Sequence, residues 1–287
     1  MKKAQKVIVT PANSTIKERL KPHLHLMLTK PWRMVKNTLM FTGAFVWLLL
    51  LLICLYFYTV LSKVPNLESV PFQHVREVAV DSVQSKIESK AKLKEYQWVG
   101  IDNINRDLLY AIVMSEDGQF FSHKGVNWDA LISAIGENIK RRELSYGAST
   151  ISQQVSKNVY MRSNSKSFSR KLSELFTTRE LEKHLSKNEI LELYLNVAEF
   201  GPDIYGVKHA SKYYFDKDPA VINAAEGAFL AIMLPSPRKY HYSIFQNKHL
   251  ASRHKNKLRR IFSDMLYKEY ISPRQYNVYL SWDYFHQ

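Results

Sequence analysis

Residues 47–58 read Trp-Leu-Leu-Leu-Leu-Leu-Ile-Cys-Leu-Tyr-Phe-Tyr and lie inside a longer segment, 37–62, that contains no charged residue. As an α-helix this segment would be about 39 Å long, enough to cross a hydrocarbon core of about 30 Å. We interpret 37–62 as a transmembrane helix. A cleaved signal peptide is the alternative, but the preceding tail is long and residues 62–65 (Ser-Lys-Val-Pro) offer no small-x-small cleavage site.

The segment before this helix is strongly basic. Residues 1–36 contain nine Lys or Arg and one acid, Glu18, so their net charge is +8 (9 − 1). The positive-inside rule therefore predicts a cytoplasmic tail, with everything after Lys63 outside the cytoplasm. The whole-chain charge of +15 then leaves +7 for the outer part, without the dense basic block expected of a nucleic-acid-binding protein. Moderate basicity outside suits an anionic lipid or pyrophosphate ligand.

Beyond the membrane the sequence predicts one folded domain. The chain is 46% hydrophobic, enough for a sizeable core, and its single cysteine, Cys54, excludes an intramolecular disulfide and a thiolate metal cluster. Residues 63–97, with prolines at 65 and 71, are expected to form a stalk or linker.

The apolar spacing after about residue 102 is mainly helical. Leu108, Leu109, Ile112 and Val113 form one helical stripe that runs into Glu116. The sequence Ser-Lys-Asn-Glu at 186–189 is typical of a capping box at the start of a helix. A further apolar run, 224–234, ends before Pro235, which cannot continue a helix. These patterns predict a predominantly α fold.

The first polar constellation is Ser-Glu-Asp-Gly-Gln-Phe-Phe-Ser-His-Lys-Gly at 115–125. An acid at a helix C-terminus opposes the helix dipole, so Glu116 is unfavourably placed for a purely structural role. A solvated acidic turn with Phe120 and Phe121 in the core is the structural alternative. His123 alone, without a second His or Cys at ligand spacing, indicates a hydrogen-bonded packing residue rather than a metal ligand.

The second constellation is Gly-Ala-Ser-Thr-Ile-Ser-Gln-Gln-Val-Ser-Lys-Asn at 147–158. It combines hydroxyl groups with paired amides, which are suitable partners for sugars. Gln153 and Lys157 are four residues apart and would share one face of a helix. A polar helix start with no role in binding is the alternative.

The third constellation, residues 166–174, contains Lys166, Arg170, Lys171 and Glu174. Arg170 and Glu174 are i and i+4 neighbours on a helix, so an exposed salt bridge is the structural interpretation. Clustered cations of this kind also bind phosphate oxygens.

In this order and spacing the three constellations resemble the family 51 glycosyltransferases, which polymerise the glycan strands of peptidoglycan. The first resembles the family's E-D-x-x-F-x-x-H-x-G, the second G-[GA]-S-T-I-[TS]-Q-Q followed by K-N, and the third R-K-x-x-E. A fourth motif, K-x-x-I-L-E-x-Y-L-N, is matched at residues 187–196. The resemblance covers residues 98–240, which it implies to be the glycosyltransferase core of a lysozyme-like helical fold, with 241–287 as a C-terminal helical extension.

This resemblance implies a reaction and roles for the matched residues. The substrate would be lipid II, an undecaprenyl-pyrophosphoryl disaccharide-peptide, added to a growing lipid-linked strand with inversion of the anomeric centre. Glu116 would be the general base and Glu174 a second catalytic carboxylate that positions the reacting groups or holds a cation. The expected substrate-binding residues are Ser149, Thr150, Gln153, Lys157, Lys166, Arg170 and Lys171.

The same resemblance also implies which cofactors and partners to expect. No cofactor is required by this chemistry, although Mg²⁺ or Mn²⁺ held by Asp117 or Glu174 remains an option. The membrane is an expected partner, other cell-wall synthases and division proteins are candidate ones, and nucleic acid is not expected. The sequence departs from the family pattern with Asn127 at a common aspartate and Lys166 at a usual arginine. No K-T-G follows Ser163-x-x-Lys166, so an enzyme without a transpeptidase domain is expected.

Two other functions use similar residues. A lytic, lysozyme-like enzyme that cleaves finished wall would also need a glutamate, but wall polymer carries no pyrophosphate to match the cations near Arg170. A catalytically silent scaffold for wall synthesis is the second alternative. Separately, Trp128, Leu131, Ile132 and Ile135, followed by basic residues at 140–142, predict either an amphipathic flap that dips into the membrane interface or an ordinary core-facing helix.

Overall fold

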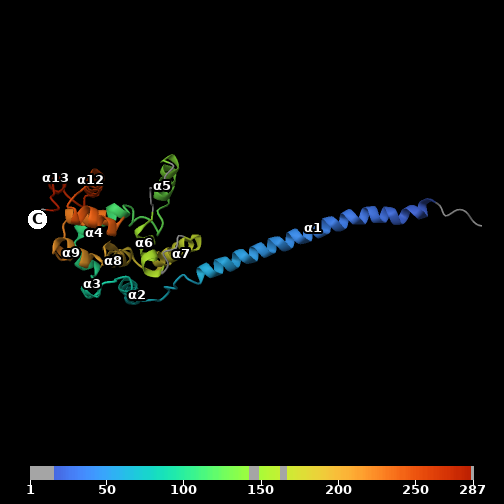
Figure 1. Cartoon of the computed structure of the whole chain (residues 1–287), viewed down its shortest axis with the longest axis horizontal. Coiled ribbons are helices and arrows are strands. Elements are labelled where there is room, and N and C mark those ends of the chain that lie inside the picture. Colours follow the sequence, from blue (N-terminus) through green and yellow to red (C-terminus); the bar gives the residue numbers. More distant parts are fainter. Residues whose placement is uncertain (1–15, 142–148, 162–166, 286–287) are drawn as a thin grey trace, which may run out of the picture. The chain divides into compact units, whose positions relative to one another are not determined.

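The computed structural model describes residues 16–141, 149–161 and 167–285. The chain divides into two compact units, one that ends at Thr59 and one that runs from Val60 to the C-terminus. Helix α1 (Ile16–Leu61) accounts for the structure of the first unit (Figure 1). Its stretch Trp32–Leu61 is long and apolar enough to cross a membrane and exposes most of its side chains. The predicted apolar helix is therefore confirmed, and it begins before residue 37.

The second unit is built around helix α4 (Arg106–Glu116). Asn105 caps this helix by accepting a hydrogen bond from the amide of Asp107, and the helix buries six apolar residues, Leu108, Leu109, Ala111, Ile112, Val113 and Met114. Helix α10 (Ala224–Met233) packs directly against it. A Cβ at Gly227 would lie 2.9 Å from Leu108 Cα, so glycine allows the two helices to approach closely. Helix α4 ends at Glu116, as the sequence predicts.

Three helices form the layer that carries the other motifs: α6 (Ile151–Tyr160), α7 (Phe168–His184) and α8 (Lys187–Val197). The predicted capping box at Ser186 and Glu189 is present at the start of α8. Helix α6 packs on both α7 and α8. A short antiparallel hairpin, β1 (Glu199–Gly201) and β2 (Ile204–Tyr205), follows α8.

The remaining elements of this unit complete the core and its rim. They are α2 (Phe72–Gln84), α3 (Lys90–Glu95), η1 (Ile101–Asn103), α5 (Trp128–Arg141), α9 (Val207–Phe215), η2 (Pro219–Val221), α11 (Pro237–Tyr240), η3 (His241–Gln246), α12 (Ser252–Tyr267) and α13 (Pro273–Leu280). Helix α12 packs against both α4 and α10, whereas α5 stands away from the other helices of this unit in Figure 1. The predominantly α fold predicted from the sequence is confirmed.

The segment 63–97 differs from the stalk expected of it. Helix α2 lies within it and buries Val75, Ala79 and Val83 in the core. These residues are spaced four apart, so they form a helical stripe that the prolines and charged neighbours obscure in the sequence. The segment therefore belongs to the folded unit.

Residues 96–101 are held in place by α8 through the fourth motif. Both carboxylate oxygens of Glu192 accept hydrogen bonds, one from Trp98 Nε1 and one from the amide of Ile101, each at 2.8 Å. Asn196 bonds both the amide and the carbonyl of Val99. Glu192 and Asn196 are thus engaged in fixing the entry of the chain into the core.

Candidate active site

Glu116 lies at the C-terminal end of α4 with its side chain largely buried. Its Oε1 atom accepts a hydrogen bond from Ser115 Oγ at 3.2 Å and lies 3.6 Å from Lys257 Nζ. Its Oε2 atom accepts a hydrogen bond from Gln154 Nε2 at 3.2 Å. A carboxylate oxygen has two lone pairs, so Oε2 retains one with which to accept a proton.

The next residue, Asp117, is buried and is used to fix the loop that follows. His123 Nε2 donates to both of its oxygens, at 3.0 and 2.9 Å, and the amide of Ile151 donates to Oδ2 at 3.1 Å. Ile151 is the first residue of α6, where the positive end of the helix dipole favours an anion. Asp117 therefore joins the first motif to the start of the second.

Thr150 and Gln153 form the N-terminal capping box of α6. Thr150 Oγ1 also donates to the carbonyl oxygen of Gly125 at 2.6 Å, and the Gln153 side chain is buried. The Thr150 hydroxyl and the side-chain oxygen of Gln153 thus already have partners within the protein, while Ser149 is exposed. Substrate binding by these three residues stays a prediction. The amide that reaches Glu116 belongs instead to Gln154, one residue further along.

The third motif forms a charge cluster on α7. Glu174 is buried and pairs with Arg170 Nη1 at 3.1 Å and with Lys171 Nζ, one cation on each carboxylate oxygen. Because two cations face one carboxylate, the cluster keeps a net charge of +1. Arg170 and Lys171 are partly exposed, and Lys166 lies outside the described residues.

A buried polar network fastens α6 to α7 and α8. Ser152 Oγ donates to Glu182 Oε1, which also receives a hydrogen bond from Lys187 Nζ at 2.7 Å. Lys187 Nζ lies 4.4 Å from the centroid of the Phe120 ring. The network thus joins Phe120 of the first motif, Ser152 of the second, Glu182 of the helix that carries the third, and Lys187 of the fourth. These contacts fix the positions of the motifs relative to one another.

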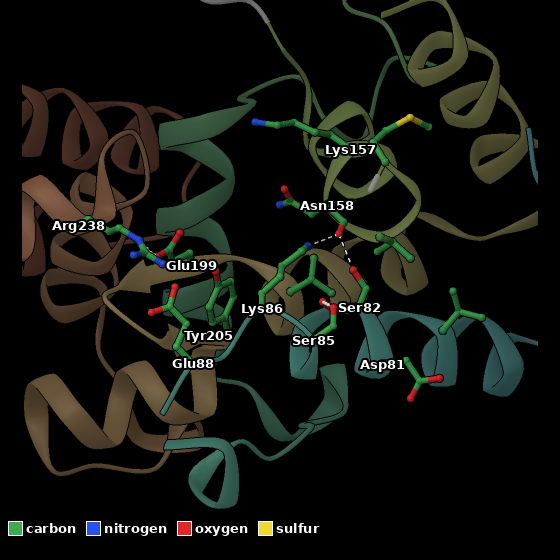
Figure 2. A pocket seen from close by; sticks show the side chains of 14 residues that line it. Asp81, Ser82, Ser85, Lys86, Glu88, Lys157, Asn158, Glu199, Tyr205 and Arg238 are labelled. Carbon is green, nitrogen blue, oxygen red and sulfur yellow. Dashed lines mark hydrogen bonds and ion pairs between the residues drawn. The ribbon is translucent and has the colours of Figure 1, made fainter. Parts of the chain in front are cut away.

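A polar cleft of about 1200 Å³ opens between α2, the end of α6, the β1–β2 hairpin and α11. Lys157 of the second motif lines it and is exposed. The other charged lining residues come from two parts of the chain, Asp81, Lys86 and Glu88 from α2 and the segment after it, and Glu199 and Arg238 from β1 and α11 (Figure 2). A cleft with balanced charges and exposed hydroxyl and amide groups suits a large polar ligand.

Lys86 lies half-buried in this cleft and supports the helix that carries Lys157. Its ammonium and Ser82 Oγ both donate to the carbonyl oxygen of Asn158 (Figure 2). This carbonyl lies in the last turn of α6, where cations are favoured by the helix dipole. Burial, and then the nearby charge of Lys157, lower the pKa of Lys86.

Both carboxylates proposed for a metal are engaged by protein groups. Both oxygens of Asp117 and both oxygens of Glu174 face protein donors. Among the described residues, no group of three His, Cys, Asp or Glu side chains is placed to hold a metal ion. Dependence on Mg²⁺ or Mn²⁺ stays a prediction from the resemblance.

The sequence profile of the transglycosylase family matches residues 83–265. The chain therefore belongs to the transglycosylase family, which confirms the resemblance found in the motifs and the lysozyme-like helical fold class. The match begins within α2, in agreement with the packing of that helix into the core.

Individual relatives agree with this membership. A biosynthetic peptidoglycan transglycosylase of Janthinobacterium sp. (strain Marseille) is 38% identical over 193 residues, 67% of this chain and 82% of the relative. One of Azoarcus sp. (strain BH72) is 37% identical over 212 residues, 74% of this chain and 88% of the relative. One of Pasteurella multocida (strain Pm70) is 46% identical over 142 residues, 50% of this chain and 57% of the relative.

Proposed function

We propose that this transglycosylase polymerises peptidoglycan glycan strands from lipid II, with Glu116 as general base and inversion at the anomeric carbon. The observation that carries the proposal is the Glu116 carboxylate, largely buried and oriented by Gln154 and Lys257, with a lone pair left on Oε2. A base of this kind contributes about 10²- to 10⁴-fold in rate by taking the proton of a sugar hydroxyl.

The reaction needs one bond to form and one to break. The hydroxyl oxygen of lipid II attacks the anomeric carbon of the growing strand, and its proton passes to Glu116 Oε2. The bond from the anomeric carbon to the pyrophosphate oxygen breaks, and undecaprenyl pyrophosphate leaves with the bonding electrons. Direct displacement assisted by one base inverts the anomeric centre, as in inverting glycosidases.

Cations of the second and third motifs are proposed to support the departure of pyrophosphate. Lys157 is exposed on the cleft, and the cluster of Arg170, Lys171 and Glu174 has a net charge of +1. Fixed positive groups stabilise negative charge that develops in a transition state. We assign Glu174 the role of holding Arg170 and Lys171 in position, while the cleft beyond Lys157 is large enough for a glycan.

The anchor helix supports the same function. A lipid-linked donor and acceptor both reside in the membrane, so an enzyme tethered by Trp32–Leu61 works where its substrates are. The basic tail, by the positive-inside rule, supports an N-terminus in the cytoplasm and everything after Lys63 outside it. We also infer a chain without transpeptidase activity, because the sequence lacks the K-T-G signature of that chemistry.

The decisive experiment incubates the detergent-solubilised full chain with labelled lipid II and compares wild type with Glu116→Gln. Glu77→Gln, an exposed carboxylate on α2, is the matched control. We expect long glycan strands from wild type and Glu77→Gln, and none from Glu116→Gln, whose fold is kept. Polymer made by Glu116→Gln would contradict the assignment of Glu116 as the base. Fragments released from preformed wall would indicate a lytic enzyme, and lipid II binding without turnover would indicate a scaffold.

A further inference from the structure

The C-terminal helix α12 reaches the proposed base, although it lies outside the four motifs. Lys257 Nζ is 3.6 Å from Glu116 Oε1, and the Lys257 side chain is about one-third exposed. Helix α12 packs against α4, and Tyr270, in the segment that follows α12, stacks on the ring of Tyr110 of α4 with centroids 3.7 Å apart. The position of Lys257 is therefore set by the fold and not only by its own flexible side chain.

The surroundings of Glu116 explain why a cation is needed there. The negative end of the α4 dipole and the neighbouring carboxylate of Asp117 both disfavour a second negative charge. His123 is directed at Asp117, α6 contributes the neutral amide of Gln154, and α10 contributes the carbonyl of Ala231 near Ser115 Oγ. Among the described residues, Lys257 is the cation that pairs with Glu116.

A further ionisable group near Glu116, among the described residues, is the phenol of Tyr194 on α8. Its pKa is raised well above the ordinary value by burial and then by Glu116 and Asp117, so it stays neutral. Its hydroxyl has no hydrogen-bond partner among the described residues. Tyr194 therefore adds no positive charge, so among these groups Lys257 is the one that offsets the negative charge of Glu116.

We propose that Lys257 is a positioning residue for the general base, a role that rests on the proposed function. Its ammonium lies at Oε1, where it offsets the negative charge of Glu116 at the end of α4 and holds the carboxylate in place, so that Oε2 is left to accept the proton of the substrate hydroxyl. Lys257 itself touches no reacting atom. The C-terminal helices thereby become part of the active site and not only an extension of the fold.

The test compares Lys257→Met, which removes the charge at similar size, with Lys257→Arg, which keeps it. Lys255→Met is the control, because Lys255 lies on the same helix but lines a separate cleft with Trp282. The kcat/KM for lipid II is measured against pH in the detergent-solubilised full chain. We expect the acidic limb of Lys257→Met to move up by about one pH unit, equal to about a tenfold loss below the limb.

The expected pattern distinguishes positioning from a merely structural contact. At alkaline pH the activity of Lys257→Met should return to within about threefold of wild type with KM little changed, and Lys257→Arg should restore the acidic limb. Equal loss at every pH, or an unshifted limb, would overturn the role of Lys257. A lowered Tm with the same limb would likewise assign the contact to stability alone.

A second readout does not depend on turnover. In protein labelled with ¹³C at glutamate carboxyls, the Glu116 signal is the one missing from Glu116→Gln. Its titration midpoint should move to higher pH in Lys257→Met and not in Lys255→Met. No polymer from wild type would overturn the proposed function, whereas polymer with an unshifted limb and an unshifted signal would overturn only the inference about Lys257.

Discussion

His123 holds Asp117 from one side while its own second nitrogen is held by the backbone. Nε2 lies 2.9 Å from Asp117 Oδ2, and Nδ1 accepts a hydrogen bond from the amide of Gly125 at 3.2 Å. A ring nitrogen that accepts an N–H bond carries no proton, so Nε2 is the nitrogen that donates to Asp117. The contacts of His123 with Asp117 and with the amide of Gly125 thus fix the loop of the first motif, which follows Glu116.

Replacing His123 by Ala should therefore destabilise the domain without removing the base. Asp117 would keep its charge in a buried position with one donor fewer, so we expect a loss of about 1–3 kcal/mol in the free energy of unfolding. Urea denaturation of wild type and variant measures this change. His74→Ala, an exposed histidine on α2, should alter stability by less than about 0.5 kcal/mol. Equal values for the two variants would contradict the structural role of His123.

Gly125 allows this loop to lie against α7. Gly125→Ala should therefore lower the stability of the domain more than the addition of one methyl group suggests. Its φ is +90°, and a Cβ would lie 2.9 Å from Thr178 Cγ2 and 3.1 Å from Glu182 Cγ. We expect a loss of more than about 1 kcal/mol of stability from strain and overpacking together. The control is Gly118→Ala, where the nearest atom is 4.0 Å away. If calorimetry gives both alanine variants the same Tm, the close approach is not important for stability.

The sequence predicted those features that depend on local patterns of residues. The end of α4 at Glu116, the capping box of α8 and the end of α10 before Pro235 follow from helix periodicity, capping and proline. Thr150-x-x-Gln153 is also a capping-box signature, so the local role of these two residues was readable from the sequence.

The contacts to Glu116 could not be read in this way. Gln154 and Lys257 are separated from it by 38 and 141 positions, and only the packing of α6 and α12 on α4 brings them together. Gln153 and Lys157 do lie four residues apart on α6, but Gln153 is buried in the cap while Lys157 is exposed. Spacing along a helix fixes relative direction, whereas the neighbouring helices decide which direction faces the site.

Helix α5 should bind a membrane surface. Its residues Trp128, Ile132, Ile135 and Ile139 are all at least half exposed and, at i, i+4, i+7 and i+11, lie on one face, with Lys140 exposed near the end. This exposure favours the flap over the core-facing alternative, because a core-facing helix would bury these side chains. Replacing all four by serine should weaken binding of residues 60–287 to anionic vesicles at least about tenfold.

Vesicle sedimentation of the wild-type and substituted domains measures this effect. The matched control is Val221→Ser with Val278→Ser, two exposed apolar residues outside α5, which should leave binding unchanged. Circular dichroism should show that each variant keeps its helical fold. Unchanged sedimentation of the α5 variant would remove the membrane-binding role of this helix.

Tyr160, the last residue of α6, should make the domain sensitive to alkali. Burial raises its pKa to about 12, above the value of about 10 expected in the unfolded chain. The folded state then keeps a proton that the unfolded state loses, so this contribution is complete below pH 10 and is lost as the pH rises from 10 toward 12.

Replacing Tyr160 by Phe removes the titrating group and should flatten this loss. Between pH 9 and 11 the wild type should lose about 1 kcal/mol more unfolding free energy than Tyr160→Phe, a figure reduced for the partial exposure of the ring. Urea unfolding at the two pH values measures the difference. Tyr267→Phe, a substitution at an exposed tyrosine, should follow the wild type. If Tyr160→Phe follows it too, then the phenol of Tyr160 is not protected by the fold, and the end of α6 must open to water before the rest of the domain unfolds.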